Sequence, residues 1–590
     1  MDARTVLAAC PLFAGLNQDS VARLAAEATP VQLSGGERLF AAGEPSEILY
    51  IVATGRLRAV FPGGRIAGDI ARLEPIGEIG LLTGDVRGAS VHALRPSLLY
   101  AFSRRTFQTF ALLEPAALMA ITRVILTRMR EPDREIKLRA ARKTRTLTVL
   151  AAGNDIDGPA FAARLNEALG GHTTLADARR AARETGIDPD ESGSAQTLRN
   201  WMDQLEFDHK QVVYDASGPA GWMRATLQQA DRIVAVADAG TLPPPTGSPL
   251  PEALTALRQA TLHSPVELVL LRRNGDSAAG TLAWKNALQA AGHYFVRPGH
   301  AGDIASLARQ LTGHGVGLVL GGGGARGFAH VGLLKAMQEL GIPVDVCGGA
   351  SMGALIAALY ASGRNTDEIT AALKDAFIRR NLLNDYRLPR VSLIAGRKFH
   401  RHLRNLFGDL RVEHLPTPYF CVSTNLTHGR SEVHDQGLVA DWLAASMCIP
   451  GLAPPVAWKG SLLCDGAVVN SLPTDVMQSL ARGLIVACDV STEGAIAAPG
   501  VHGPDPDFDA IHNPVRGAQR VNLIDVLFRT TALNAESSTQ ARAERADLYL
   551  RMPVGGIRTF DWSAVDTLID TGYRHAMAHL PVLLERGNVS

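Results

Sequence analysis

Residues 317–337, GLVLGGGGARGFAHVGLLKAM, constrain the fold of this chain more than any other stretch. An apolar run ends in four consecutive glycines, and a helix-like pattern follows. Glycine is needed where the backbone takes positive φ or where a ligand approaches main-chain N–H groups, and a helix N-terminus adds a positive dipole. The stretch therefore predicts a strand, an anion-binding loop and a helix. A phosphate, a pyrophosphate or a transition-state oxyanion would each fit this loop.

Two phosphate-binding motifs can be compared with this loop. Gly322, Gly324 and Gly327 form a G-x-G-x-x-G pattern between strand and helix, as in dinucleotide sites. That fingerprint requires an acidic residue at the end of the next strand, whereas Asp345 lies near the beginning of that strand. No G-K-[ST] follows the glycines, so the loop is not a P-loop. A dinucleotide-dependent enzyme is thus disfavoured.

The next strand ends in the pentapeptide 349–353, GASMG, which has the G-x-S-x-G pattern of a nucleophile elbow. Gly349 and Gly353 permit the sharp turn, and Ser351 is the expected nucleophile; the alternative is that Ser351 caps the following helix. A nucleophilic serine produces an oxyanion that needs main-chain donors, so the glycine loop predicts an oxyanion hole. Its residues are Gly322, Gly323 and Gly324, with Arg326 beside them.

A serine nucleophile also needs a base. The stretch 460–473, GSLLCDGAVVNSLP, predicts a short strand followed by Asp465 and a turn, so Asp465 could take the serine proton. The alternative for this stretch is an ordinary Asp-Gly hairpin turn. A Ser-His-Asp triad also stays open because the chain has 17 histidines, although none lies in a stretch that indicates such a role.

The motifs G-G-G-x-R-G, G-x-S-x-G and D-G-A, in this order, resemble the patatin-like phospholipase family. The resemblance runs from residue 315 into the C-terminal region and implies hydrolysis of lipid acyl esters by a Ser-Asp dyad without histidine. It assigns Ser351 as the nucleophile and Asp465 as the base. Ala467 stands where the family often has glycine, which leaves the carboxylate untouched.

Residues 12–110 alternate short apolar and polar runs with Gly and Pro between them, which predicts a small antiparallel β-barrel with flanking helices. Within it, residues 77–90, GEIGLLTGDVRGAS, resemble the phosphate-binding cassette of cyclic-nucleotide domains. The resemblance assigns Glu78 to the ribose hydroxyl and Arg87 to the cyclic phosphate, which suits a bidentate guanidinium. The flanking positions are Gly88, Ala89 and Ser90. A plain interaction module is the alternative.

Strand-like and helix-like runs alternate over residues 147–296, which predicts a parallel α/β layer without a complete catalytic or phosphate-binding motif. A barrel, this layer and a patatin-like domain together resemble the neuropathy target esterase group. The expected fold is multidomain: a barrel, a middle α/β domain and a C-terminal α/β patatin-like hydrolase domain. The expected segments are a cyclic-nucleotide-binding-like domain at 1–130, a helical basic connector at 131–146, the α/β domain at 147–312 and the hydrolase domain at 313–590.

Composition restricts partners and location. Net charge is +1, so no global field favours nucleic acid or an acidic membrane, and the six cysteines form no C-x-x-C pair. The sequence has neither a standard signal peptide nor an apolar run of about 18 residues. We therefore expect a cytoplasmic protein. The resemblances imply an enzyme without metal or cofactor, with a phospholipid or lysophospholipid substrate and a cyclic nucleotide as candidate ligand; the alternative is a regulatory or binding protein with a vestigial hydrolase site.

One stretch leaves peripheral contact with the inner face of a membrane open. Residues 395–407, AGRKFHRHLRNLF, combine basic and apolar side chains at helical spacings. Such a helix could rest on a lipid surface. The alternative is a core-packed helix with a solvated basic face. The residues are Arg397, Lys398, Arg401 and Arg404 with Phe399, Leu403, Leu406 and Phe407.

Overall fold

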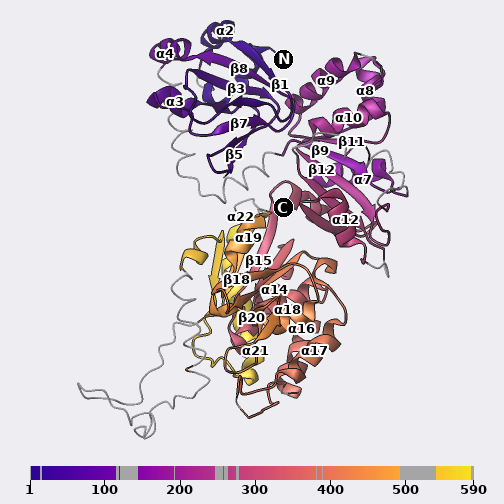
Figure 1. Ribbon diagram of the computed structural model, residues 1–590, viewed down its shortest axis with the longest axis vertical. Helices are drawn as coiled ribbons and strands as arrows, with labels where there is room; N and C mark the ends of the chain where they lie inside the picture. Colours follow the sequence, from indigo (N-terminus) through magenta and orange to yellow (C-terminus); the bar gives the residue numbers. More distant parts are fainter. Residues whose placement is uncertain are drawn as a thin grey trace, which may run out of the picture. The chain divides into compact units, whose positions relative to one another are not determined.

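The computed structural model forms two compact units, Met1–Gly313 and His314–Ser590 (Figure 1). It describes all residues except 1, 14–15, 65, 115–118, 120–143, 154, 192, 246–254, 256, 258–263, 274–277, 381, 389, 481, 492–525, 527–539 and 586–590. Most of the predicted connector, residues 131–146, lies outside the described residues.

The expected antiparallel β-domain is confirmed in the first unit as two four-stranded sheets, with strand orders β1-β8-β3-β6 and β2-β7-β4-β5. Its core comes from alternate strand residues such as Leu49, Ile51 and Leu99. The strands are β1 (Thr29–Leu33), β2 (Arg38–Phe40), β3 (Ile48–Thr54), β4 (Leu57–Val60), β5 (Ile66–Ile70), β6 (Pro75–Ile76), β7 (Ser90–Ala93) and β8 (Ser97–Ser103). The helices are α1 (Ala3–Ala9), η1 (Pro11–Phe13), α2 (Gln18–Ala26), α3 (Glu78–Thr83) and α4 (Arg104–Leu113).

The expected parallel α/β layer is also confirmed in the first unit, as a six-stranded sheet of order β10-β11-β9-β12-β13-β14. The predicted strands are all present, and the short strand β10 is an addition. The strands are β9 (Thr146–Ala151), β10 (Thr173–Ala176), β11 (Gln211–Asp215), β12 (Arg232–Asp238), β13 (Val266–Leu271) and β14 (Gly292–Val296). The helices are α7 (Gly158–Leu169), α8 (Ala178–Thr185), α9 (Ser194–Asp208), α10 (Ala220–Gln229), α12 (Thr281–Leu288) and α13 (Ala301–Leu311).

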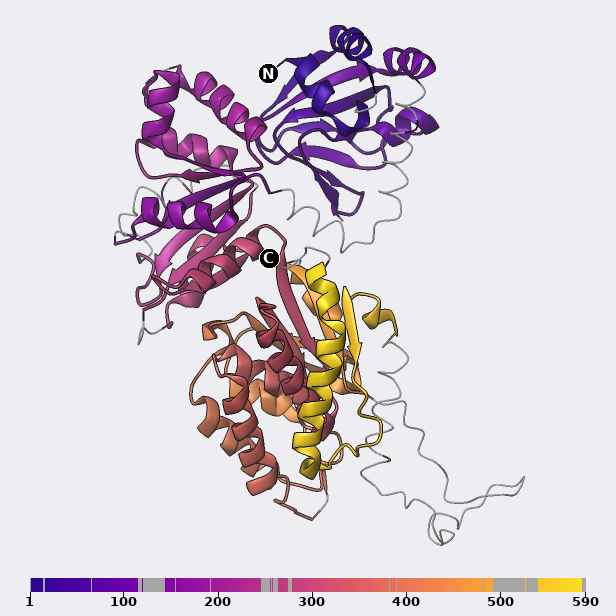
Figure 2. The same cartoon turned by 180° about the vertical axis from the view of Figure 1, so that it is seen from behind.

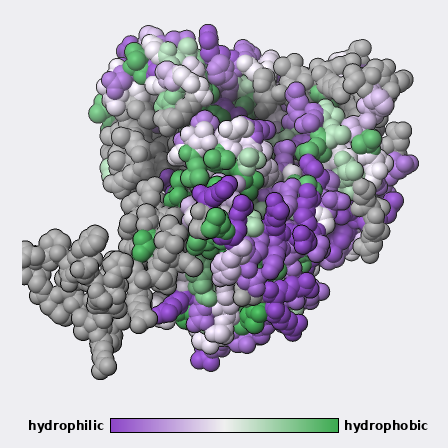
Figure 3. Space-filling view, turned by 60° about the horizontal axis from the view of Figure 1, so that its bottom comes forward, coloured by the Kyte–Doolittle hydropathy of each residue, from purple (hydrophilic) through white to green (hydrophobic). Residues whose placement is uncertain are grey.

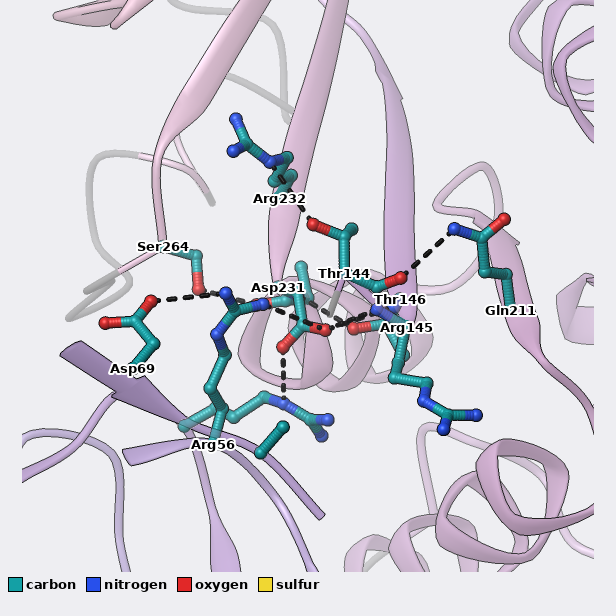
Figure 4. A network of polar contacts seen from close by, with 12 residues as sticks. Arg56, Asp69, Thr144, Arg145, Thr146, Gln211, Asp231, Arg232 and Ser264 are labelled. Carbon is teal, nitrogen blue, oxygen red and sulfur yellow. Dashed lines mark hydrogen bonds and ion pairs between the residues drawn. The ribbon is translucent and has the colours of Figure 1, made fainter. Parts of the chain in front are cut away.

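A buried charge network joins the barrel to this α/β layer within the first unit. Arg95 is 2% exposed and donates to both carboxylate oxygens of Glu206 (2.9 and 2.7 Å) and to Asp231 (3.0 Å). Arg56 lies 3.5 Å from Asp231 and 3.2 Å from Asp69 (Figure 4). Burial alone would raise the pKa of Asp231, but the charges of Arg95 and Arg56 outweigh it and lower the pKa.

The second unit contains an eight-stranded sheet of order β19-β20-β17-β16-β15-β21-β22, with β18 paired to β17. Strands β17, β16, β15, β21 and β22 are parallel neighbours, whereas β18, β19 and β20 pair antiparallel. The strands are β15 (Gly315–Leu320), β16 (Val346–Ala350), β17 (Tyr419–Asn425), β18 (Arg430–His434), β19 (Val456–Trp458), β20 (Ser461–Asp465), β21 (Gly483–Asp489) and β22 (Leu548–Arg551).

Helices cover both faces of this sheet because its central strands are apolar on both sides. Leu318 and Leu320 face a large core with α14, α15 and α21, whereas Val319 faces a smaller one with α19. The long helix α21, yellow in Figure 2, packs on α14. The helices are η2 (Gly324–Phe328), α14 (Ala329–Glu339), α15 (Met352–Ala361), α16 (Thr366–Lys374), η3 (Asp375–Arg379), α17 (Arg397–Phe407), η4 (Val412–His414), α18 (Val439–Ser446), η5 (Gly466–Val468), α19 (Thr474–Leu480), η6 (Trp562–Ala564), α21 (Val565–His579) and α22 (Pro581–Glu585).

Candidate active site

Ser351 occupies a strained turn between β16 and α15. Its backbone has φ 52° and ψ −124°, a conformation that is costly for a residue with a side chain. A Cβ on Gly349 would lie 2.3 Å from the Leu320 carbonyl oxygen, and one on Gly353 would lie 2.2 Å from it. Only glycine fits at both positions, which explains the spacing of the G-x-S-x-G pattern.

Asp465 reaches Ser351 because of the sheet register. Strand β17 lies between β16 and β20. Ala350, at the end of β16, pairs with Val422, and Asp465, at the end of β20, pairs with Ser423. Because Val422 and Ser423 are consecutive residues in the middle of β17, the serine and the aspartate meet beside the same part of that strand. The Ser351 hydroxyl donates to Asp465 Oδ2 at 2.7 Å.

The Asp465 carboxyl is buried and more basic than a carboxyl in water. Burial raises its pKa to about 6, although the Ala467 N–H and the Ser351 hydroxyl both donate to it and act in the opposite direction. The Ala467 bond is 2.8 Å long and holds Oδ1, which leaves Oδ2 for the serine. A carboxylate of this basicity is charged at pH 7 and is suited to accept a proton.

The structure does not show the two alternative roles, a helix cap for Ser351 and a hairpin turn for Asp465. The Ser351 side chain makes no capping hydrogen bond to α15. Asp465 is followed by the 3₁₀ turn η5 rather than by the second strand of a hairpin. Within the described residues, the Ser351 hydroxyl forms a hydrogen bond with Asp465 and none with a histidine.

The glycine loop offers fewer oxyanion donors than the sequence predicted. The Gly322 N–H donates to the Ser471 carbonyl at 3.0 Å, so the prediction that it points at an oxyanion is wrong for this structure. The N–H groups of Gly323 and Gly324 have no such hydrogen bond within the described residues. Arg326 is also corrected: it is buried and donates to Thr559 Oγ1 at 2.7 Å, so it braces the loop from the side.

Three supporting residues were not predicted. His330 is fully buried, its Nε2 lies 2.9 Å from the Gly321 carbonyl, and burial lowers its pKa to about 4, so the ring is neutral. Ser446 accepts the Ser351 N–H at 3.0 Å. The Thr559 carbonyl accepts the Ala325 N–H at 2.7 Å. Ser446 and Thr559 lie far along the chain from the residues they hold, so no local pattern indicates them, whereas His330 is nine positions from Gly321.

Ser351 opens into a cavity of about 510 Å³. Most of its wall is apolar, and its aromatic residues are Phe377, Phe399, Trp442, Trp458, Phe560 and Trp562. The few polar groups include Arg397, His400 and Asp441, and His400 Nε2 lies 2.8 Å from Asp441 Oδ1. This combination of an apolar wall, few polar groups and a buried reactive serine suits a ligand with a long apolar part.

Three family models match consecutive segments of the chain. The cyclic nucleotide-binding domain matches residues 30–112, the Neuropathy Target Esterase family P-loop like domain matches residues 143–312, and the patatin-like phospholipase model matches residues 318–477. An NTE family protein of Mycobacterium tuberculosis is 28% identical over 98% of this chain and 96% of its own length. Over nearly its whole length the chain is similar to proteins of the neuropathy target esterase family.

Longer relatives match nearly the same region. Lysophospholipase nte1 of Aspergillus niger is 29% identical over 95% of this chain, and patatin-like phospholipase domain-containing protein 7 of Rattus norvegicus is 27% identical over 94% of it. The chain spans 42% and 46% of these two relatives. The match to the patatin-like phospholipase model confirms the expected enzyme class, a carboxylic ester hydrolase.

The predicted nucleotide-site residues of the N-terminal domain lie around α3. Glu78 and Arg87 are 2% and 6% exposed. Arg87 Nη2 donates to the Ile48 carbonyl at 2.7 Å, and the guanidinium carbon lies 4.1 Å from the centre of the Phe40 ring. Its Nε and Nη1 are buried without a hydrogen-bond partner among the described residues. Unsatisfied buried N–H groups are costly, so an anion would stabilise this arginine.

The remaining cassette residues differ in exposure and bonding. Gly88 is exposed, and a Cβ there would meet nothing within 4 Å. Ala89 is half-buried. The Ser90 hydroxyl accepts the Ala42 N–H at 3.0 Å, so its oxygen is already used within the barrel, and its proton is left to donate.

For the basic stretch 395–407, the core-packed alternative is right. The apolar face of α17, formed by Phe399, Leu403 and Phe407, is buried in the core of the second unit. Arg404 lies 3.3 Å from Asp441 and extends along the protein surface. Lipid contact through the apolar face of this helix is therefore excluded, because that face is already covered.

Other features of the described residues bear on the earlier expectations. All six cysteines are free and buried, as expected. Within the described parts of the chain, no helix has the length and apolar character needed to cross a membrane. No group of three or more metal-ligating side chains gathers in these same parts.

Proposed function

We propose that this chain is a serine esterase that hydrolyses acyl esters of phospholipids or lysophospholipids, with Ser351 as nucleophile and Asp465 as general base. The observation that carries the proposal is the 2.7 Å hydrogen bond from the serine hydroxyl to a buried carboxylate at the apolar cavity. The names of the longer relatives, a lysophospholipase and a patatin-like phospholipase protein, support the substrate class.

In the proposed reaction, Asp465 takes the Ser351 proton while Oγ attacks the acyl carbonyl. The N–H groups of Gly323 and Gly324 stabilise the oxyanion that forms. When the tetrahedral intermediate collapses, the leaving alkoxide takes the proton from Asp465 and departs as the alcohol. Water then attacks the acyl-enzyme, gives its proton to Asp465, and the fatty acid is released as Ser351 regains a proton. The apolar wall holds the acyl chain throughout.

The test is a lipid-panel hydrolysis assay combined with active-site labelling. We expect the full-length protein to release fatty acid from lysophospholipid or phospholipid. A fluorophosphonate should add one label per chain at Ser351, because it forms a stable covalent analogue of the tetrahedral state. Peptide mass spectrometry locates the label, and Ser351→Ala should carry none. Hydrolysis by a protein whose label sits on another serine would overturn the assignment.

A second function, binding of a cyclic nucleotide, is favoured by the two unpartnered nitrogens of the buried Arg87. In this proposal Arg87 binds the cyclic phosphate and Glu78 the ribose, and the N-terminal domain thereby regulates the esterase. A ligand changes the activity only if it binds two states of the protein differently. Activation is therefore tested separately from binding, by measuring hydrolysis with and without nucleotide.

We expect cyclic AMP or cyclic GMP at millimolar concentration to raise the melting temperature of the first unit, because a ligand that binds only the folded form stabilises it. Arg87→Ala should abolish this shift, and Arg105→Ala, an exposed arginine of the same barrel, should retain it. Differential scanning fluorimetry of the full chain and titration calorimetry measure both effects. If neither nucleotide gives heat or a shift, the barrel is an interaction module.

A further inference from the structure

Residues 378–401, here called the rim segment, connect α16 and η3 to the first turn of α17 and form part of the cavity wall. Leu383 and Ile394 of this segment line the cavity. Backbone hydrogen bonds hold it to the body of the unit, as when the Leu393 N–H donates to the Gly451 carbonyl at 2.9 Å. The backbone of the rim segment is therefore held in place beside the cavity, and so are the side chains on its outer side.

The outer side of the rim segment exposes large apolar side chains. Tyr386 and Leu388 are each 78% exposed, Val391 is 67% exposed and Ile378 is 43% exposed. Single exposed apolar residues are ordinary, but several on one short segment mark an interaction surface. Figure 3, which turns the lower end of Figure 1 forward, shows hydrophobic side chains next to strongly hydrophilic ones on this face of the molecule.

The rim segment is also strongly basic. It contains six arginines and one lysine but only one acidic residue, Asp385. That carboxylate accepts the N–H groups of Gly396 (3.3 Å) and Lys398 (3.2 Å), so its charge faces the start of α17. Four exposed arginines of the segment form no ion pair with a carboxylate of the described residues. They are Arg387, Arg390, Arg397 and Arg401.

We propose that the rim segment docks on an anionic phospholipid surface. Tyr386, Leu388 and Val391 enter the boundary between headgroups and acyl chains, while Arg387 and Arg390 bind lipid phosphates. The proposal rests on the proposed esterase function, because docking would bring the cavity that contains Ser351 to the layer where its substrate lies. Lipid contact is thus assigned to this segment and not to the apolar face of α17, which is buried.

The test is cosedimentation of the full-length Ser351→Ala protein with phosphatidylcholine vesicles, with and without phosphatidylglycerol. We expect binding to the anionic vesicles that weakens at high salt, since exposed charges are screened. Arg387→Gln with Arg390→Gln should lower the partition coefficient about 10- to 30-fold. Tyr386→Ser, Leu388→Ser and Val391→Ser combined should lower it at least about 10-fold. The matched control, Arg179→Gln with Arg183→Gln on α8, should bind like the parent.

Four outcomes separate the docking surface from the chemistry. With Ser351 intact, the rim variants should lose hydrolysis of vesicle lipid but keep that of a soluble chromogenic ester. If no ester is turned over, the esterase proposal fails while the vesicle measurement still decides the docking surface. Unchanged partitioning of both rim variants overturns the docking proposal. It is overturned equally if these variants abolish self-association in sedimentation velocity and still bind vesicles, because the surface would then join two copies of the chain.

Discussion

Ser351→Ala and Asp465→Asn are each expected to lower kcat/KM by at least about 10³-fold while the protein stays folded. The alanine removes the nucleophile, and the amide cannot take the serine proton. Because the two groups act in the same step, the double variant should be little worse than either single variant. Steady-state hydrolysis of a soluble ester measures the losses, and thermal unfolding reports on the fold.

The pKa of Asp465 gives this prediction a second readout. Since the base must be ionised, wild-type kcat/KM should be level above pH 6 and fall about tenfold per unit below it. The stability of the protein changes in the opposite direction. A carboxyl whose pKa is raised in the folded state contributes stability at low pH, and this contribution is lost as pH rises through the folded pKa. Asp465→Asn removes this cost and should melt no lower than wild type at pH 8. The residual kcat/KM of this variant should not show the fall below pH 6.

Two further variants test whether the loss is specific. Asp345 is a buried carboxylate of the same unit that accepts the Val316 N–H at 2.9 Å, so Asp345→Asn should affect stability more than turnover. His434 lies 2.7 Å from the Ser423 hydroxyl and offers a serine–histidine pair for comparison. If His434→Gln abolishes turnover and Asp465→Asn retains it, the base is a histidine and the dyad assignment is wrong.

Arg95→Met is expected to destabilise the first unit by about 3–5 kcal/mol, because it leaves Glu206 buried without its arginine and Asp231 with Arg56 as its remaining arginine. The second unit should be unaffected. Hydrogen exchange measured by mass spectrometry on the full chain distinguishes the two units. Exchange in the strands of the first unit should accelerate on the order of 10²- to 10³-fold, while β15 and β16 keep their wild-type rates.

The controls use the same residue type and the same network. Arg23→Met removes an arginine whose side chain is 65% exposed and which lies 3.8 Å from Glu114, so it should change exchange little. Adding Glu206→Gln to Arg95→Met should recover part of the loss, since the amide removes one unpaired buried charge. Wild-type exchange in Arg95→Met would show that the network contributes nothing to the stability of this unit.

Local patterns predicted a large part of this protein. The strands of the α/β layer followed from apolar runs such as residues 231–238, and the turn at Ser351 followed from glycines that are needed within two residues of it. In contrast, β10 was missed because four residues, two threonines followed by a leucine and an alanine, carry little periodic signal. The catalytic roles of Ser351 and Asp465 stay predictions that the proposed experiments test.

By itself, the sequence determined which short segments become strands, turns and helices, and which residues in them can carry chemistry, because these properties depend on neighbours along the chain. Only the tertiary structure decided which distant groups meet. Ser351 and Asp465 are 114 positions apart and pair through the register of β17. The Gly322 N–H is used by Ser471, and the apolar face of α17 is covered by the core. Helical spacing identifies an apolar face, and a glycine loop identifies backbone N–H donors. The residues that cover that face or accept from those donors lie elsewhere in the chain, so packing decides which they are.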